Sequence, residues 1–396
     1  MKKLFIAAFM FVSTFTSNVF ADGHAIKMGI ILGFTGPIES LTPAMRDSAK
    51  LAFSEASSSG SLLGGKKITV IEGDSTCVDS AAAQAAAEKL VADGVVAIMG
   101  ADCSGVTGAI ASNVAVPNGV VMISPSATSP GLTDLDDKGF FFRTAPSDAR
   151  GGQILADITK DRKIKSVAIT YTNNDYGKGL ADVYASAVKA HGIKVTTTAA
   201  HEDGKADYTA EVSTLASAGG DALVVIGYLD QGGKGIIQGS LDSGAFDTFI
   251  LSDGMIGDSL TDAFGKNLNK SFGSLPGSTG KGAGVFAKVA KAGGIDSSGP
   301  YTGESYDAAA LLVLAMQAGG SADRASIAKN VMSVANGPGK KIYPGELKKA
   351  LDLLANGKAV DYEGATGVSF TDVGEAFGSF LEKEIKGGKF KTKKQR

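Results

Sequence analysis

Short apolar runs rich in β-branched residues alternate with longer amphipathic or alanine-rich stretches along the first part of the chain. The apolar runs predict strands, at residues 26–32, 67–72, 95–99 and 120–123. The stretches between them predict helices, each preceded by a Gly, Ser or Asp turn, at residues 44–57, 81–92 and 104–114. This alternation is typical of βαβ units with a parallel sheet.

The same alternation restarts after Pro146. It predicts helices at 149–159 and 178–189 and strands at 166–170, 194–198, 222–226 and 249–251. The pattern therefore predicts two doubly wound α/β units.

Beyond residue 270 the chain changes character. Residues 270–299 are rich in Gly, Ser and Lys, and helices are predicted after them at 301–318, 324–334 and 344–355. Helices without strands of their own need a sheet to pack on. We therefore expect this part of the chain to return to the first unit.

The N-terminus has the pattern of an export signal. Met1-Lys2-Lys3 is a short cationic start, and the apolar run 4–12 and then Val19-Phe20-Ala21 follow it. The apolar run is too short to span a bilayer, which needs about 20 residues. We expect residues 1–21 to be a signal peptide and the mature chain to start near Asp22.

About 375 mature residues are more than one hydrophobic core usually serves, so two domains are expected. The content of 44% hydrophobic and 20% charged residues is typical of a globular chain, and a net charge of −2 argues against nucleic acid as a partner. Basic residues gather only at 386–396. We interpret this segment as a solvated end, with contact to a membrane or transporter as the alternative.

The chain has two cysteines, Cys77 and Cys103. An exported chain meets an oxidising compartment, which favours a disulfide. Two buried free thiols or half of a metal site are the alternatives. A metal site has little support, because none of the three histidines lies at ligand spacing from a cysteine.

Open doubly wound sheets bind ligands beyond the carboxyl ends of their strands. In the first unit, two of the loops at this edge, 100–105 and 124–130, are dense in hydroxyls. Such loops suit a carboxylate, although Ser and Thr are also favoured as ordinary helix caps. The second unit offers Tyr176, Tyr228 and Asp253 instead, an apolar wall and an acid for an ammonium group. Together the two units are complementary to a zwitterion. The alternative is that the tyrosines pack in the core and the acid caps a helix.

Enzymatic patterns are weak. No complete G-x-G-x-x-G, phosphate loop or Gly-x-Ser-x-Gly motif is present. A Ser-His-Asp arrangement would have to use His24, His191 or His201, which lie at the mature N-terminus, at a predicted helix end and in a polar loop. We expect no enzymatic activity, no cofactor and no metal.

Several short motifs occur in a characteristic order: Thr35-Gly36-Pro37, Leu63-Gly64-Gly65-Lys66, Gly73-Asp74-Ser75-Thr76-Cys77, Gly100-Ala101-Asp102-Cys103-Ser104, Ser124-Pro125-Ser126-Ala127-Thr128, Phe142-Arg143-Thr144, Asp175-Tyr176-Gly177-Lys178-Gly179 and Tyr306-Asp307-Ala308. In order and spacing the chain resembles the branched-chain amino-acid (leucine/isoleucine/valine-binding) type of periplasmic solute-binding protein of ABC transporters. The resemblance covers nearly all of the mature chain.

The resemblance implies roles for individual residues. The carboxylate grip falls on Ser104 and Thr128, and backbone groups at Ser126 help to hold the ammonium group. Ala127, in the same loop, is a further ligand-binding position. The second-lobe tyrosines fall on Tyr176 and Tyr228, and the ammonium-binding acid on Asp253. The cysteine pair falls on a family disulfide. This chain departs from the pattern at Leu41, where the family often has tyrosine, and at Asp253, where it has glutamate.

The resemblance also implies the type I periplasmic binding fold, α/β with two doubly wound parallel-sheet lobes joined by three crossings. Lobe 1 would be 22–144 with 276–376, and lobe 2 would be 145–275 with 377–396. The implied function is that of a monomeric periplasmic protein that binds an α-amino acid, aliphatic or branched, and delivers it to ABC permease subunits. The alternatives are an amide, urea or aromatic acid as ligand, or a ligand-sensing ectodomain.

Overall fold

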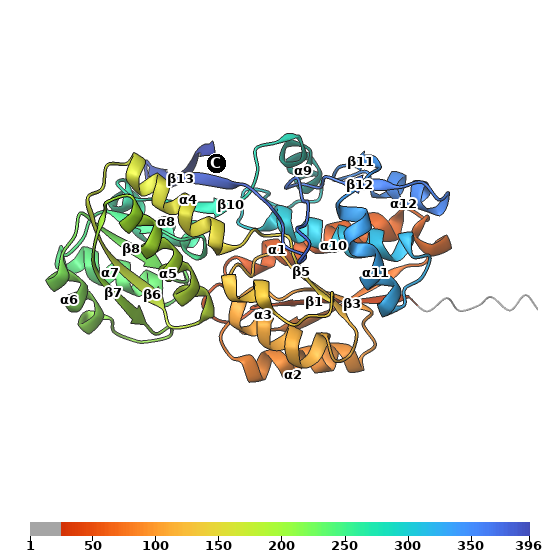
Figure 1. Cartoon of the computed structure of the whole chain (residues 1–396), viewed down its shortest axis with the longest axis horizontal. Helices are drawn as coiled ribbons and strands as arrows, with labels where there is room; N and C mark the ends of the chain where they lie inside the picture. Colours follow the sequence, from red (N-terminus) through yellow and green to blue (C-terminus); the bar gives the residue numbers. More distant parts are fainter. Residues whose placement is uncertain (1–24) are drawn as a thin grey trace, which may run out of the picture.

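The computed structural model describes residues 25–396, so the predicted signal peptide lies outside the described residues. Two sheets, each flanked by helices, lie side by side along the long axis of the molecule (Figure 1). We call these halves the first lobe, built on the sheet of β1 to β5, and the second lobe, built on the sheet of β6 to β10, β13 and β14. The predicted α/β class with two wound units is confirmed.

The sheet of the first lobe is parallel throughout. Its central strands are almost continuous apolar runs because helices cover both faces. In spatial order the strands are β2 (Ile68–Asp74), β1 (Ile26–Leu32), β3 (Ala97–Gly100), β4 (Val121–Ser124) and β5 (Phe141–Arg143).

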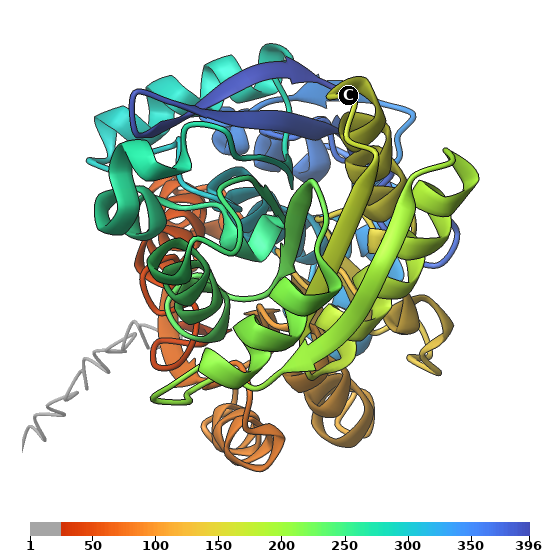
Figure 2. The same cartoon turned by 90° about the vertical axis from the view of Figure 1, so that its left-hand side faces the viewer.

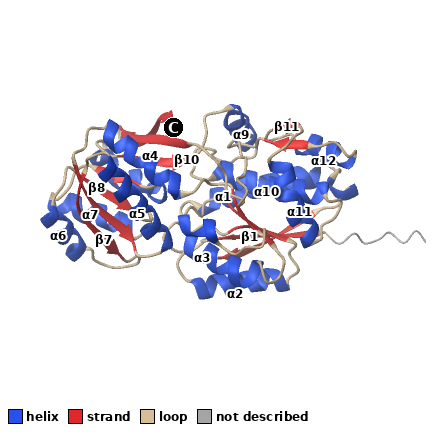
Figure 3. Ribbon diagram, in the orientation of Figure 1, coloured by secondary structure: helices blue, strands red, loops and turns tan. Residues whose placement is uncertain are grey.

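Helices α2 and α3 lie on one face of this sheet, and α1 and α10 lie on the other (Figures 1 and 3). Helix α10 is buried along almost its whole length, which its apolar composition on all sides allows. The late helices thus return to the first lobe, as predicted. The helices of this lobe are α1 (Thr42–Ser58), α2 (Ser80–Ala92), α3 (Ser104–Ile110), α9 (Lys281–Ala292), α10 (Thr302–Ala318), α11 (Arg324–Ala335) and α12 (Leu347–Ala355). A short parallel pair, β11 (Lys340–Ile342) and β12 (Val360–Tyr362), lies among the last of them.

The sheet of the second lobe is parallel from β7 to β10, as predicted, and an antiparallel hairpin that was not predicted is added at one edge. Its spatial order is β14 (Lys389–Gln395), β13 (Phe380–Lys386), β10 (Phe272–Pro276), β9 (Phe249–Leu251), β8 (Ala222–Ile226), β6 (Ser166–Thr172) and β7 (Lys194–His201). The hairpin of β13 and β14 runs antiparallel to β10 and closes one edge. The helices of this lobe are α4 (Asp148–Asp161), α5 (Asp175–Ala190), α6 (Thr209–Ala218), α7 (Gly232–Ser243) and α8 (Asp258–Phe264).

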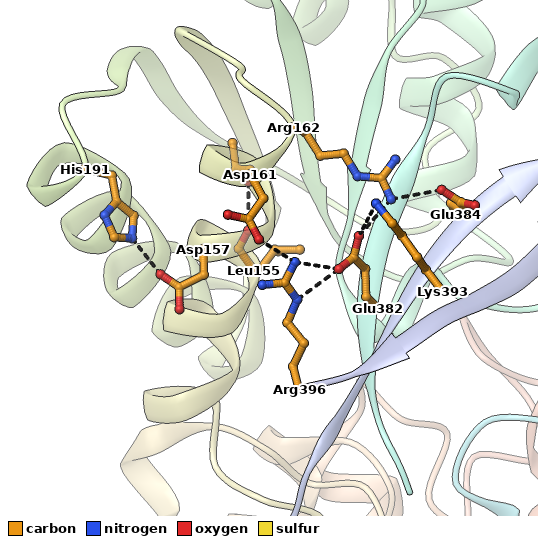
Figure 4. Close-up of polar contacts among 10 residues, drawn as sticks. Leu155, Asp157, Asp161, Arg162, His191, Glu382, Glu384, Lys393 and Arg396 are labelled. Carbon is orange, nitrogen blue, oxygen red and sulfur yellow. Dashed lines mark hydrogen bonds and ion pairs between the residues drawn. The ribbon is translucent and has the colours of Figure 1, made fainter. Parts of the chain in front are cut away.

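The basic segment 386–396 was interpreted as a solvated end, and most of its side chains are exposed, although its backbone is ordered. It forms strand β14, which Figure 2 shows in blue with β13 across the upper end of the second lobe. Its side chains are largely exposed, but Arg396 is anchored (Figure 4). The Arg396 guanidinium donates hydrogen bonds to Glu382 and, at 2.7 Å, to Asp161. Glu382 is fully buried and also accepts a hydrogen bond from Arg162 at 2.8 Å.

The glycine-rich stretch 270–299 was not predicted to hold regular structure, yet it contains β10 and α9. Both are short and rich in Gly, Ser or Lys, so their local signal is weak. Among the described residues, no helix combines the length and the apolarity needed to cross a membrane.

Candidate functional site

The loops at the carboxyl edge of the first sheet are organised by the buried carboxylate of Asp102. It accepts hydrogen bonds from the Gly33 backbone N–H at 2.6 Å, from the Ser75 hydroxyl at 2.9 Å and from the Cys103 N–H at 3.0 Å. Burial raises its pKa, and these hydrogen bonds oppose that rise. Asp102 therefore draws the loops after β1, β2 and β3 together.

The two hydroxyl-rich loops lie against each other, as predicted. Ser104 begins α3, and its Oγ accepts the backbone N–H of Ser129 at 3.0 Å. The Ser126 hydroxyl donates to the Asp102 carbonyl oxygen at 3.1 Å, and the Ala127 N–H donates to Ser124 Oγ at 3.0 Å. The proton of Ser104 therefore stays free to donate to a ligand, whereas that of Ser126 is already used.

Thr128 and Asp148 form a second polar pair beside these loops. The Asp148 N–H donates to the Thr128 carbonyl oxygen at 2.8 Å. Both side chains are buried, and neither Thr128 Oγ1 nor Asp148 Oδ2 has a hydrogen-bond partner among the described residues. Burial, and then the negative charge of Asp253, raise the pKa of Asp148 well above its usual value. Unpaired polar atoms in a buried position are costly unless a ligand or water completes them.

Arg143 fixes the loop that carries Thr128. Its side chain is fully buried, and its guanidinium donates to the carbonyl oxygens of Ala127 at 3.1 Å and Ser129 at 2.8 Å. It also forms an ion pair with Glu375, which lies in the segment that leads to the C-terminal hairpin. The conformation of the loop thus depends on a residue more than two hundred positions further along the chain.

Two tyrosine rings line the facing edge of the second lobe. Tyr176 lies in the first turn of α5, and Tyr228 follows β8. Their rings stack with centroids 5.3 Å apart and an angle of 17° between the planes. Both are almost fully buried, so they offer a flat apolar wall with hydroxyls at its rim.

Asp253 lies after β9 in a short 3₁₀ turn (Asp253–Met255) and is the centre of a hydrogen-bond network. Its Oδ1 accepts the Tyr176 hydroxyl at 2.6 Å, and its Oδ2 accepts the Tyr301 hydroxyl, which comes from the first lobe at the start of α10. Burial raises the pKa of Asp253, while the two tyrosine hydroxyls oppose the rise. The pKa values of Tyr176 and Tyr301 are well above their usual range because both are buried and lie beside this acid.

These side chains enclose one cavity of about 30 Å³, room for roughly two waters. Its lining is Ile38, Leu41, Met45, Asp102, Cys103, Ser104, Ser126, Tyr176, Tyr228, Asp253, Gly254 and Tyr301. The structure therefore brings together five of the seven predicted ligand residues. Ala127 and Thr128 lie next to the cavity without lining it.

Cys77 and Cys103 form the predicted disulfide. It ties the loop after β2 to the loop after β3, and Cys103 itself lines the cavity. Across the described part of the chain, no group of three or more His, Cys, Asp or Glu side chains could hold a metal ion.

Four residues at or beside the cavity were not predicted: Ile38, Met45 and Tyr301 line it, and Asp148 contacts the Thr128 backbone. The predicted residues lie in loops that leave strands, whereas Asp148 begins helix α4 and Tyr301 directly precedes helix α10, from which its hydroxyl reaches Asp253 of the second lobe. Asp148 could have been predicted as an acid that follows the Arg143-Thr144 motif within a few residues. The residues around Tyr301 give no local indication that it belongs to the site.

Both the sequence and the fold of the chain have counterparts among known proteins. Residues 25–346 match the family model described as "Periplasmic binding protein". Leu/Ile/Val-binding protein homolog 1 of Brucella melitensis biotype 1 is 31% identical over 324 residues, which cover 80% of this chain and 84% of that protein. Leu/Ile/Val-binding protein homolog 3 of the same strain is also 31% identical to this chain, over 234 residues, which cover 59% of this chain and 62% of that protein.

Solved structures share the fold. The branched-chain amino acid transporter substrate binding protein LivJ from Streptococcus pneumoniae, in complex with isoleucine, superposes with a TM-score of 0.77 and 23% identity, covering 94% of this chain and 99% of that one. A solute binding protein of an ABC transporter from R. palustris, in complex with benzoate, gives a TM-score of 0.75 at 17% identity, covering 94% and 96%.

Proposed function

The chain belongs to the periplasmic binding protein family, and on this premise we propose that it is the solute-binding component of an ABC uptake transporter and takes an α-amino acid between its lobes. One observation carries the proposal. Hydroxyl donors from the first lobe and the acid Asp253 from the second lobe face one small cavity. That arrangement complements the two charges of a zwitterion.

The carboxylate of the ligand lies, in this proposal, on the first lobe. Ser104 has a free hydroxyl proton, and Thr128 Oγ1 is buried without a partner among the described residues, so both can donate. Ser126, in the same loop as Thr128, also lines the cavity. Hydroxyl donors bind an anion without a countercharge, which fits the absence of Lys and Arg from the residues that line the cavity.

The ammonium group lies between Asp253 and Asp148. A carboxylate has about four acceptor directions, so Asp253 can accept an ammonium while keeping its bonds to Tyr176 and Tyr301. A cation at this point would also relieve the repulsion between the two buried acids. We therefore add Asp148 to the residues that bind the ligand.

The side chain of the ligand points toward an apolar wall. Ile38, Leu41 and Met45 come from the start of the first lobe, and the stacked rings of Tyr176 and Tyr228 face them. The only charged group in this lining besides Asp253 is Asp102, which its own loops already satisfy. An aliphatic or branched side chain fits such a wall best.

Ligand entry requires the lobes to separate. The cavity of about 30 Å³ is far below the 300–1,000 Å³ of ordinary ligand pockets. We propose the lobe division 22–144 with 276–376 and 145–275 with 377–396, so that three chain crossings act as the hinge; hinge closure is a known motion of periplasmic binding proteins. Export by the signal peptide, a periplasmic location, a monomeric state and ABC permease subunits as partners belong to the same proposal.

The test is calorimetry against a panel of α-amino acids and their deaminated analogues. We expect saturable binding of an aliphatic α-amino acid, and Asp253→Asn should lose more affinity for it than for its deaminated analogue. Glu39→Gln, which alters an exposed acid outside the cavity lining, is the matched control. Equal losses for both ligands in Asp253→Asn would exclude the ammonium role.

An aromatic or other achiral acid is the second candidate ligand. It is favoured by the fact that both oxygens of Asp253 already accept tyrosine hydroxyls, so the acid is hydrogen-bonded without an ammonium. Binding of an achiral carboxylate, with no binding of any α-amino acid in the same panel, would replace the first proposal with this one.

A further inference from the structure

Asp230 joins the two lobes at a place outside the ligand cavity. It follows Tyr228 in the loop after β8 of the second lobe. Its backbone N–H donates to the Pro37 carbonyl oxygen at 3.0 Å, and its Oδ2 accepts the Ser40 N–H at 2.9 Å. Pro37 and Ser40 belong to the loop between β1 and α1 of the first lobe. These bonds can exist only while the lobes are closed.

Apolar contacts lie directly behind these hydrogen bonds. A Cβ atom placed on Gly257 of the second lobe would be 3.0 Å from Leu41 Cδ2 of the first lobe and 3.0 Å from Leu229 Cδ1. Glycine thus lets Leu41 pack closely against the second lobe. Leu41 lines the ligand cavity, whereas Asp230 does not. The contact of Asp230 with the first lobe therefore supports the cavity wall from outside.

The carboxylate of Asp230 is held in place within its own lobe. Its Oδ1 accepts the Ser259 hydroxyl at 2.7 Å, which leaves Oδ2 directed at the Ser40 N–H. The carboxylate is partly buried, so solvent screens it only in part. Hydrogen bonds to a charged acceptor are stronger than those between neutral groups.

We propose that Asp230 is a positioning residue that favours the closed state and so slows release of the ligand without touching it. The inference rests on the proposed function, because it concerns the same cavity. A group that stabilises only the closed state raises affinity for any ligand that needs closure, whichever ligand that is. Its loss should weaken every ligand by the same factor.

The test measures ligand release and the shape of the unliganded protein together. Asp230→Ala should weaken binding about 10- to 30-fold, mostly through faster dissociation, and leave the rank order of ligands unchanged. Asp230→Asn keeps an acceptor for the Ser40 N–H and should recover part of the loss. Small-angle scattering of unliganded Asp230→Ala should give a larger radius of gyration than the unsubstituted protein.

Two further variants separate the proposal from a merely structural role. Ser259→Ala removes two hydrogen bonds within the second lobe, to Asp230 Oδ1 and from Lys234 Nζ, and Asp262→Ala removes an exposed acid from α8. Asp262→Ala should leave the radius of gyration and the dissociation rate unchanged, whereas Ser259→Ala, which only loosens the Asp230 carboxylate, should change both in the same direction as Asp230→Ala and by less. If Asp230→Ala matched Asp262→Ala in scattering and in dissociation rate, the inference would be overturned.

The two failures are distinguishable. If no α-amino acid bound to the unsubstituted protein, the proposed function would fail, and the scattering comparison would still decide whether Asp230 favours closure. If amino acids bound but Asp230→Ala altered neither scattering nor release, only the present inference would fail.

Discussion

Replacing Arg143 by methionine tests whether the ligand loop is held by its buried ion pair. Methionine keeps an unbranched stem of similar length but removes the guanidinium. The change leaves the carbonyl oxygens of Ala127 and Ser129 without their donor and the carboxylate of Glu375 without its cation. The side chain of Arg143 is fully buried and that of Glu375 is 14% exposed, so water can replace little of what is lost.

The expected loss follows from this environment. Breaking a buried ion pair by removing one partner costs about 3–5 kcal/mol, because the other charge stays uncompensated. We therefore expect Arg143→Met to lower the free energy of unfolding by that amount. Ligand affinity should also fall, because the loop 127–129 loses the anchor that positions Thr128.

Urea unfolding followed by far-UV circular dichroism measures the change, since the chain has no tryptophan for fluorescence. Arg324→Met is the matched control. Its guanidinium donates to the carbonyl oxygens of Asn118 and Val95 at 3.1 and 2.8 Å, but nearer the surface and without a carboxylate. We expect it to cost about 1 kcal/mol. Equal losses in the two variants would refute the reasoning from the buried ion pair.

Two further predictions concern stability. Burial raises the pKa of Glu304 from 4.5 to about 8, so the folded protein becomes less stable as the pH rises from 4.5 to 8. In urea unfolding, Glu304→Gln should raise the free energy of unfolding by on the order of 4 kcal/mol at pH 8.5 and by almost nothing at pH 4. An equal gain at both pH values would point to another cause. Replacing both Cys77 and Cys103 by serine should cost about 3.5 kcal/mol, because the bridge spans 26 positions, and should lower the calorimetric melting temperature by roughly 5 °C. The unsubstituted protein under reducing conditions should melt like this variant; a bridge that contributes little would leave all three melting temperatures alike.

The strands that the sequence predicted well are those buried between helices. Residues 26–32, 222–226 and 249–251 were predicted as strands and are β1, β8 and β9 with the same bounds. A strand covered on both faces is apolar without interruption, so its own residues reveal it.

The hairpin of β13 and β14 could not be predicted for the opposite reason. Its residues alternate Lys with Glu or Thr and place few apolar side chains toward the protein, of which Phe380 and Ile385 are the main ones. The hairpin belongs to the sheet because β13 pairs with β10, about a hundred positions earlier. Pairing between strands so far apart in the sequence cannot be predicted from the local residue pattern.

The residues of the candidate site also fall into those that local sequence predicts and those that it does not. Ser104, Ser126, Tyr176, Tyr228 and Asp253 were found because each follows a parallel strand, and parallel strands end at one edge. Tyr301 could not be predicted in this way, because it does not follow a strand. It precedes α10 with a positive φ of 58° and reaches Asp253 only because the chain returns to the first lobe and the lobes close.

The C-terminal hairpin also has a consequence for synthesis of the chain. Strand β10 pairs with β13, so one edge of the second sheet stays open until more than a hundred later residues have been made. An open strand edge can pair with other chains. The lysines of β14 then give the finished sheet a charged border that discourages such pairing. A nascent or truncated chain without its last seventeen residues would expose the edge of β10 and would be prone to aggregate. By covering β10, the hairpin prevents this aggregation in the complete chain.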